Sequence, residues 1–155
     1  MRLALYQPDI AQNVGAILRL AACVGVGVDI IEPCGFPFGD ATLKRAALDY
    51  LRHASFVRHE SWAAFAASKP VRVVLMTTKA DRPYTSFAFE DADTILLGRE
   101  SAGVPAEVAA SADGSLMIPM CPGMRSLNVA ITAGMVLGEG LRQTNGFPAA
   151  GGAYR

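Results

Sequence analysis

Short runs of apolar residues alternate along the chain with longer stretches in which apolar residues recur every three or four positions. The apolar runs predict five strands, at residues 3–6, 26–32, 71–76, 94–97 and 116–119. The periodic stretches predict helices at residues 14–24, about 41–48, 62–68 and 128–143, and a further helix that begins at about Pro105. Because strands alternate with helices, the sequence indicates an α/β fold with a mostly parallel sheet flanked by helices.

Residues with cap preferences mark several of these boundaries. We expect Gly25 to close the first helix and Ser61 to cap the helix at 62–68. The segment 144–155 is rich in Gly, Ala and Pro, and is expected to be a flexible tail. A length of 155 residues suits one domain, so residues 1–155 are assigned to a single domain.

The composition argues for a folded protein that associates with itself. Hydrophobic residues make up 52% of the chain and charged residues 18%, which excludes intrinsic disorder. Soluble domains usually contain about 25% charged residues. We therefore expect part of the surface to be buried against a second copy, in a homodimer.

Nothing in the sequence indicates secretion or a membrane span. No stretch approaches roughly 18 uninterrupted apolar residues, and Pro8 and Asp9 come too early for the core of a signal peptide. Cys23, Cys34 and Cys121 are widely spaced, and we expect them to be buried, reduced and not metal-bound. These observations predict a cytoplasmic protein without a metal site.

The charges are balanced overall but unevenly distributed. The 14 basic and 14 acidic residues cancel, yet residues 1–82 hold an excess of basic side chains and residues 83–155 an excess of acidic ones. The segment 44–59 is especially basic, with Lys44, Arg45, Arg52 and Arg58. It is either a solvated helix face or a patch that faces phosphates.

Several common functional motifs are missing from the sequence. It contains no G-x-G-x-x-G, no G-x-x-x-x-G-K-[ST] and no G-x-S-x-G. A dinucleotide-binding Rossmann site, a P-loop NTPase and an α/β-hydrolase are therefore disfavoured.

Polar side chains instead gather where predicted strands end. Asn13 and Arg19 follow the first strand, residues 99–101 follow the fourth, and residues 125–128 open the last helix. Asn and Ser also suit helix caps, and a lone Arg is usually a surface residue. Ligands in parallel sheets bind beyond the carboxyl ends of strands, so the loops after Met76, Leu97 and Pro119 are the candidate site.

Three segments carry a specific signal. They read N-V-G-A-I-L-R-L-A at 13–21, I-L-L-G-R-E-S-A-G-V-P at 95–105, and I-P-M at 118–120 followed by R-S-L-N-V-A at 125–130. Their order and spacing resemble the three motifs of the SpoU/TrmH branch of the SPOUT RNA methyltransferases. The resemblance covers about residues 1–143.

Shorter landmarks resemble one group within that branch, the TrmL-like tRNA methyltransferases. They are L-Y-Q-P-D-I at 5–10, I-E-P-C-G-F at 31–36, L-D-Y at 48–50 and T-T-K at 77–79. The chain departs from the pattern at Gln7 and Asp9, where two Glu are expected, and at Arg99, where Gly-Pro-Glu has become Gly-Arg-Glu.

The resemblance implies a SPOUT fold with a C-terminal deep trefoil knot, a homodimer, and S-adenosyl-L-methionine as cofactor. It implies cofactor contacts, mostly through the backbone, at Met76, Gly98, Ile118 and Ser126. It also implies a catalytic role for Arg19, which would assist deprotonation of the ribose 2′-hydroxyl or stabilise the alkoxide that develops there. The ribose and Arg19 would be oriented by Asn13, Glu100, Ser126 and Asn128.

The implied reaction is 2′-O-methylation of the wobble nucleotide in the tRNA anticodon stem-loop, a cytidine or 5-modified uridine of leucine tRNAs. We assign RNA binding to Lys44, Arg45, Arg52, Arg58 and Arg125, and expect no DNA or membrane partner. The alternatives are methylation of another tRNA or rRNA position, a catalytically silent RNA-binding module, and a small-molecule nucleotide-binding enzyme.

Overall fold

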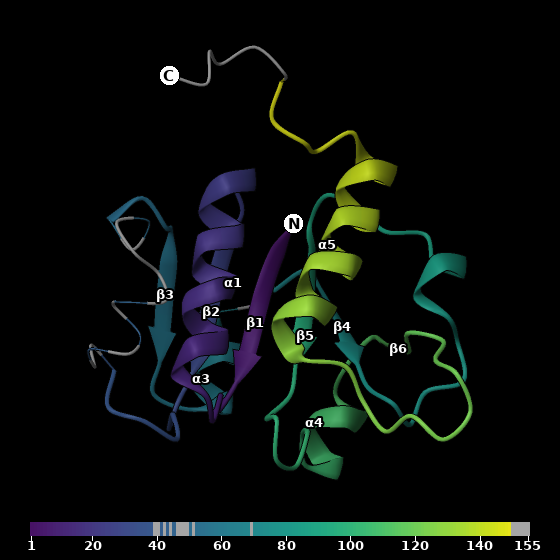
Figure 1. Cartoon of the computed structure of the whole chain (residues 1–155), viewed down its shortest axis with the longest axis horizontal. Coiled ribbons are helices and arrows are strands. Elements are labelled where there is room, and N and C mark those ends of the chain that lie inside the picture. The colour runs from purple at the N-terminus through teal and green to yellow at the C-terminus, as the bar shows by residue number, and fades with distance from the viewer. Residues whose placement is uncertain are drawn as a thin grey trace.

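A six-stranded parallel sheet forms the centre of the molecule (Figure 1). The computed structural model describes residues 1–38, 41, 43, 45, 50, 52–68 and 70–149. The strands lie in the order β3-β2-β1-β5-β4-β6. Their bounds are β1 Arg2–Tyr6, β2 Gly27–Ile31, β3 Phe56–His59, β4 Arg72–Met76, β5 Asp93–Leu97 and β6 Gly114–Leu116.

Helices cover both faces of the sheet. They are α1 Ala11–Val24, α3 Trp62–Ala67, α4 Ala106–Ala110 and α5 Val129–Thr144, with a short 3₁₀ helix, η2, at Tyr84–Ser86. The helices α1 and α5 pack on one face, and α3 and α4 contribute to the core on the other. This arrangement confirms the predicted α/β class with a mostly parallel sheet.

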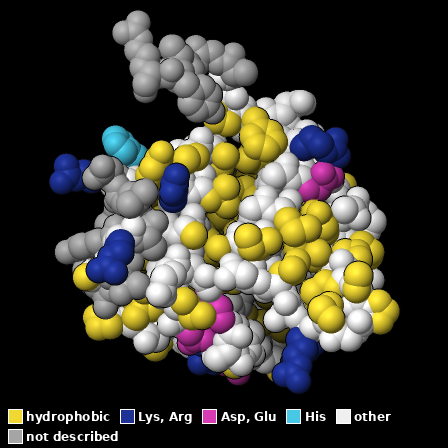
Figure 2. Space-filling model, in the orientation of Figure 1, with side chains coloured by type: hydrophobic (Ala, Val, Ile, Leu, Met, Phe, Trp, Pro, Cys, Tyr) yellow, Lys and Arg dark blue, Asp and Glu magenta, His cyan; other side chains and the backbone are white. Residues whose placement is uncertain are grey.

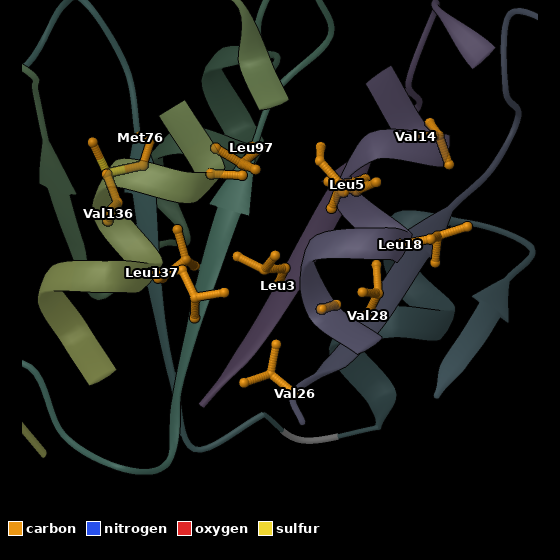
Figure 3. Close-up of a cluster of buried hydrophobic side chains, with 14 of the residues drawn as sticks. Leu3, Leu5, Val14, Leu18, Val26, Val28, Met76, Leu97, Val136 and Leu137 are labelled. Carbon is orange, nitrogen blue, oxygen red and sulfur yellow. The ribbon is translucent and has the colours of Figure 1, made fainter. Parts of the chain in front are cut away.

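The larger core lies between the sheet and the pair α1 and α5 (Figure 3). Alternate strand residues such as Leu3 and Leu5 point toward Leu18 of α1 and Leu137 of α5. The intervening residues, such as Ala4 and Tyr6, point to the opposite face, because side chains alternate along a strand. Strands buried on both faces explain the continuous apolar runs in the sequence.

The topology reverses between β1 and β5. From β1 the chain continues outward through β2 and β3, whereas β5, β4 and β6 lie on the other side. The carboxyl ends of β1 and β5 therefore flank a switch point, where crossovers leave a crevice that can hold a ligand.

Most predicted elements are present, with shifted ends. Gly25 closes α1 with φ 73°, and the Ser61 hydroxyl accepts a 3.1 Å bond from the amide of Ala64. The helix α1 begins at Ala11, three residues before its predicted start. Asn13, which could have been a cap, therefore lies inside the helix. The last strand is Gly114–Leu116 rather than residues 116–119.

Two expectations from the sequence need correction, and two others fall largely on residues outside those described. A sixth strand, β3, was missed because this edge strand is mostly exposed and carries Arg58 and His59 in place of an apolar run. Cys23 and Cys121 are exposed and only Cys34 is partly buried, so the prediction of buried cysteines was wrong. The predicted helix at about 41–48 lies largely outside the described residues, as does the end of the tail at 150–155.

No helix within the described residues is long and apolar enough to cross a bilayer.

Replacing Val74 with Ala is expected to lower the free energy of unfolding by about 2–3 kcal/mol. Val74 is fully buried in β4, so the change removes two packed methyl groups and leaves a cavity. Val71 is 77% exposed just before the same strand, and Val71→Ala should cost less than about 0.5 kcal/mol. Urea unfolding of both variants measures the difference, and equal losses would contradict this packing.

Candidate active site

A cleft of about 930 Å³ opens at the carboxyl ends of β4, β5 and β6. Its walls come from the segments that follow Met76, Leu97 and Leu116, together with the loop that leads into α5. The loops after Met76, Leu97 and Pro119, which the sequence predicted as the candidate site, therefore all contribute to the cleft. All four positions predicted to contact a cofactor line the cleft: Met76, Gly98, Ile118 and Ser126.

A chain of side-chain hydrogen bonds borders this cleft. Asn13 is buried, with 8% of its surface exposed, and its Nδ2 donates a 2.9 Å bond to Oε1 of Glu100. Asn128 Nδ2 donates in turn to Oδ1 of Asn13, also at 2.9 Å. Because a carboxylate only accepts, Glu100 fixes the orientation of the Asn13 amide and, through it, that of Asn128.

Asn128 also starts α5. Its Oδ1 accepts bonds from the backbone amides of Ala130 (2.8 Å) and Ile131 (3.3 Å), so it is a helix N-cap. The Asn128 side chain therefore both caps α5 and bonds Asn13. Asn13 is not a cap, because α1 is preceded by Ile10 and the Asn13 side chain turns to Glu100.

The same carboxylate anchors the segment after β1. Glu100 Oε2 accepts a 2.9 Å bond from the amide of Asp9, and Asp9 Oδ2 accepts bonds from the amide (3.0 Å) and hydroxyl (2.6 Å) of Ser101. Chiefly the bond from the Ser101 hydroxyl holds the pKa of Asp9 below its ordinary value, against the opposing effect of burial. Ionised Asp9 thus stabilises the fold above its ordinary pKa, and this contribution is lost as the pH falls through the lowered value.

The loop after β5 is too tight for a side chain at Gly98. A Cβ there would lie 2.7 Å from the carbonyl carbon of Gly103. Arg99 and Gly103 exchange two backbone hydrogen bonds of 3.0 and 2.8 Å, and Gly103 has φ 67°. The two glycines therefore allow a closely folded loop that carries its backbone along the cleft.

Arg19 does not join this group within one chain. It lies on α1, is exposed, and is absent from the described residues that line the cleft. Its guanidinium lies 5.1 Å from the centre of the Tyr50 ring. Of the five predicted catalytic residues, Asn13, Glu100 and Asn128 are bonded together, Ser126 lines the cleft, and Arg19 lies outside it.

The predicted RNA-binding residues differ in their surroundings. Arg45, Arg52 and Arg125 are exposed. Arg58 forms an ion pair with Glu32 and lies 4.4 Å from the centre of the Phe38 ring, so its charge is partly engaged. Lys44 lies outside the described residues. Figure 2 shows Lys and Arg side chains on both sides of this face, some of them on the side of α1 and β3, with hydrophobic side chains between them.

Several site residues were not assigned from the sequence. Asp9 and Ser101 tie two loops together, while Thr77, Thr78 and Lys79 line the cleft. The Asp9–Ser101 contact follows from the pairing of β1 with β5, which the sequence does not display. The Thr-Thr-Lys segment was visible as a landmark directly after an apolar strand.

Comparison with known proteins decides the family. The sequence matches the "SpoU rRNA Methylase family" over residues 1–138. The chain belongs to this family. As a member of the SpoU methylase family it is a methyltransferase, which confirms the resemblance seen in the three motifs. A tRNA (cytidine(34)-2′-O)-methyltransferase of Beijerinckia indica subsp. indica is 57% identical over 144 residues, or 91% of this chain and 90% of that protein.

Solved structures of the SpoU methylase family share the fold. A structure described as "Structural insights into the 2-OH methylation of C/U34 on tRNA" superposes with a TM-score of 0.88 at 40% identity, covering 92% of this chain and 94% of the other. The SpoU methyltransferase AviRb of Streptomyces viridochromogenes, in complex with AdoMet, has a TM-score of 0.81 at 26% identity, covering 92% of this chain and 60% of that chain. The SPOUT-type α/β fold is thereby confirmed, while the trefoil knot stays a prediction.

Replacing Glu100 with Gln is expected to destabilise the protein by about 1–3 kcal/mol, although the two side chains have the same shape. Both oxygens of Glu100 accept hydrogen bonds, one from Asn13 and one from the Asp9 amide. A Gln amide has a single acceptor oxygen, so its NH₂ group must face a donor.

The matched control is Asp9→Asn. A single oxygen of Asp9 accepts both bonds from Ser101, and an Asn oxygen can replace it. We expect this variant to lose less than about 1 kcal/mol. Chemical denaturation at neutral pH compares the two, and a larger loss for Asp9→Asn would contradict the assigned network.

Proposed function

We propose that this chain transfers a methyl group from S-adenosyl-L-methionine to the 2′-hydroxyl of nucleotide 34, the wobble nucleotide of a tRNA anticodon. The observation that carries the proposal is the bonded group of Asn13, Glu100 and Asn128 beside the cleft. The names of the relatives, which act on cytidine 34 or C/U34 of tRNA, support the target.

The cleft fits the proposed cofactor. Its volume of about 930 Å³ lies within the range of small-molecule sites. The loop at Gly98 and Gly103 brings backbone close to the cleft, which suits recognition of an adenine by main-chain groups. Met76, Gly98, Ile118 and Ser126 would hold the cofactor, which supplies the methyl group.

Glu100 acts by positioning. Each of its two oxygens already accepts a hydrogen bond, one from the Asp9 amide and one from Asn13. The carboxylate is therefore poorly placed to accept the proton of the ribose hydroxyl. The amides of Asn13 and Asn128 each donate one bond within the network and retain a second N–H. We assign these remaining donors to orienting the ribose oxygens.

Arg19 requires a second copy of the chain to act at the cleft. It is exposed and lies outside the cleft of its own chain, so a homodimer that brings α1 of one copy to the cleft of the other would complete the site. Exposed apolar side chains near the starts of α1 and α5 supply a surface for such contact: Ile10, Met124, Leu127, Ile131 and Met135. A guanidinium there would stabilise the developing alkoxide and contact the adjacent phosphate.

The anticodon loop suits this chemistry physically. Its bases are accessible without being extruded from a duplex, and the 2′-hydroxyl distinguishes RNA from DNA. We assign cytidine or a modified uridine at position 34 as the target, and the cytoplasm, where tRNA is used, as the location.

The direct test incubates the protein with S-adenosyl-L-methionine and tRNAs that carry C34 or U34, followed by mapping of ribose methylation. Methylation at nucleotide 34 alone supports the proposal. Methylation at another tRNA or rRNA position would replace the target. RNA binding without transfer would identify a catalytically silent module.

Arg19→Ala is expected to abolish methyl transfer while changing the affinity for S-adenosyl-L-methionine by less than about tenfold. The reason is that Arg19 lies outside the cleft assigned to the cofactor. Single-turnover methylation and calorimetric titration measure the two effects separately.

A mixture of Arg19→Ala and Asn13→Ala chains, refolded together, provides the control for the dimer. One cleft in each mixed dimer would then have Asn13 from one copy and Arg19 from the other, and part of the activity should return. Full activity of Arg19→Ala alone would remove Arg19 from the mechanism.

The double variant Arg45→Ala and Arg52→Ala is expected to weaken tRNA binding and to lower the slope of log affinity against log salt by about one per lost phosphate contact. Both side chains are exposed, and Arg58 is left out because Glu32 engages it. Arg142→Ala is the control, since Arg142 pairs with Glu139 near the end of α5. A salt slope equal to that of the parent would show that this basic segment is a solvated face.

A further inference from the structure

Arg99 occupies an unusual position in the cleft. It stands between Gly98 and Glu100 directly after β5 and lines the cleft with them. The family pattern to which this segment is similar has Gly-Pro-Glu here. Arg99 therefore puts a long cationic side chain at a position where the pattern has a compact proline.

The Arg99 side chain has an unused donor. Its Nε is buried and donates no hydrogen bond, the only such side-chain nitrogen or oxygen among the described residues. The guanidinium lies 5.9 Å from the centre of the Tyr6 ring. Arg99 takes part in none of the ion pairs found within the described ranges. A buried donor without a partner costs stability, and such a group in a cleft calls for a ligand explanation.

Neighbouring acids do not supply the missing partner. The Asp9 carboxylate is bonded to Ser101, and both oxygens of Glu100 accept bonds from Asn13 and the Asp9 amide. Glu100 lines the cleft, and Asp9 is bonded to Ser101, which also lines it, so two carboxylates lie on this side of the cleft. An anionic group could approach here only if a cation faces it, and Arg99, which directly precedes Glu100 and lines the same cleft, can supply that cation.

The backbone holds Arg99 in place before any ligand arrives. Its N–H and C=O are both bonded to Gly103, and Gly98 lies so close to Gly103 that a Cβ at Gly98 would collide with it. Lys79 lines the same cleft, but it is exposed and a point charge on a flexible stem. The planar guanidinium is suited to bind two oxygens of one carboxylate or phosphate.

We propose that Arg99 binds an oxyanion of the ligands in this cleft, either the carboxylate of S-adenosyl-L-methionine or a phosphodiester of the RNA beside the target ribose. The inference rests on the proposed function and deepens it, because it names the residue that binds the negatively charged group of the cofactor or of the RNA. Arg99 then recovers in the complex the hydrogen bonds that it lacks in the free protein.

The test uses Arg99→Met and Arg99→Lys in the full chain. Calorimetry measures the affinity for S-adenosyl-L-methionine, and a salt series measures the affinity for an anticodon stem-loop RNA. We expect Arg99→Met to weaken one of them by about tenfold or more, and Arg99→Lys to restore only part of the loss. A loss confined to S-adenosyl-L-methionine identifies the carboxylate, and a loss confined to RNA with a lower salt slope identifies the phosphodiester.

Arg82→Met is the matched control. Arg82 also lies over an aromatic ring, 4.8 Å from the centre of Phe87, but it is absent from the residues that line the cleft. It should leave both affinities unchanged.

A melting curve separates binding from a structural role. Because Arg99→Met removes an unpaired buried donor, the melting temperature of the ligand-free variant should stay within about 4 °C of the parent. A larger drop, or unchanged affinity for both ligands, would overturn the proposal. If the parent protein itself binds neither S-adenosyl-L-methionine nor the RNA, the proposed function is wrong. That outcome is distinct from a failure of the Arg99 proposal, which is judged only from the variants.

Discussion

The hydrogen bond from the buried Asn13 amide to the Glu100 carboxylate holds the site together. It joins residues 87 positions apart, one in the first turn of α1 after β1 and one directly after β5. The pairing of β1 with β5 makes that contact possible, and Asn13 extends it to Asn128, which fixes the start of α5. Since a buried amide without a partner is costly, a change at any of the three positions disturbs both the fold and the cleft.

Side chains form the polar network beside the cleft, whereas backbone atoms shape the wall at Gly98 and Gly103. In the polar network, the carboxylates of Glu100 and Asp9 and the amide oxygen of Asn13 each accept a hydrogen bond from a distant segment. The cleft wall at Gly98 and Gly103 is instead shaped by what is missing, since a Cβ at Gly98 would collide with the facing strand of the loop. The proposed recognition of the adenine by backbone groups at this wall would explain why none of the common nucleotide-binding motifs occurs in the sequence.

Burial explains what the sequence could and could not predict. Strands buried on both faces, such as β1 and β5, appear as apolar runs and were found, whereas the half-exposed edge strand β3 was not. The loops that form the cleft follow from the ends of those runs. The sequence could not decide whether Asn13 caps a helix or bonds Glu100, because that depends on which strands are neighbours. The sequence also could not show that Arg19 lies outside the cleft. Whether a residue of α1 faces the cleft depends on how α1 packs on the sheet, and the sequence does not display that packing.

The electrostatics of the cleft reflect the same constraint. Asp9 and Glu100 are needed as acceptors that tie loops together, and two carboxylates on one side of a cleft repel any anion. The proposed cofactor carries both a cationic sulfonium and a carboxylate, and RNA brings a phosphate with each nucleotide. A site with acids alone would favour only the cation. In our proposal, Arg99, whose backbone is bonded to Gly103 and whose guanidinium lies near the Tyr6 ring, supplies the balancing positive charge and leaves one buried donor unpaired in the free protein. An unpaired buried donor lowers the stability of the free protein. Such a loss is expected at a residue whose hydrogen-bond partner is supplied by a ligand.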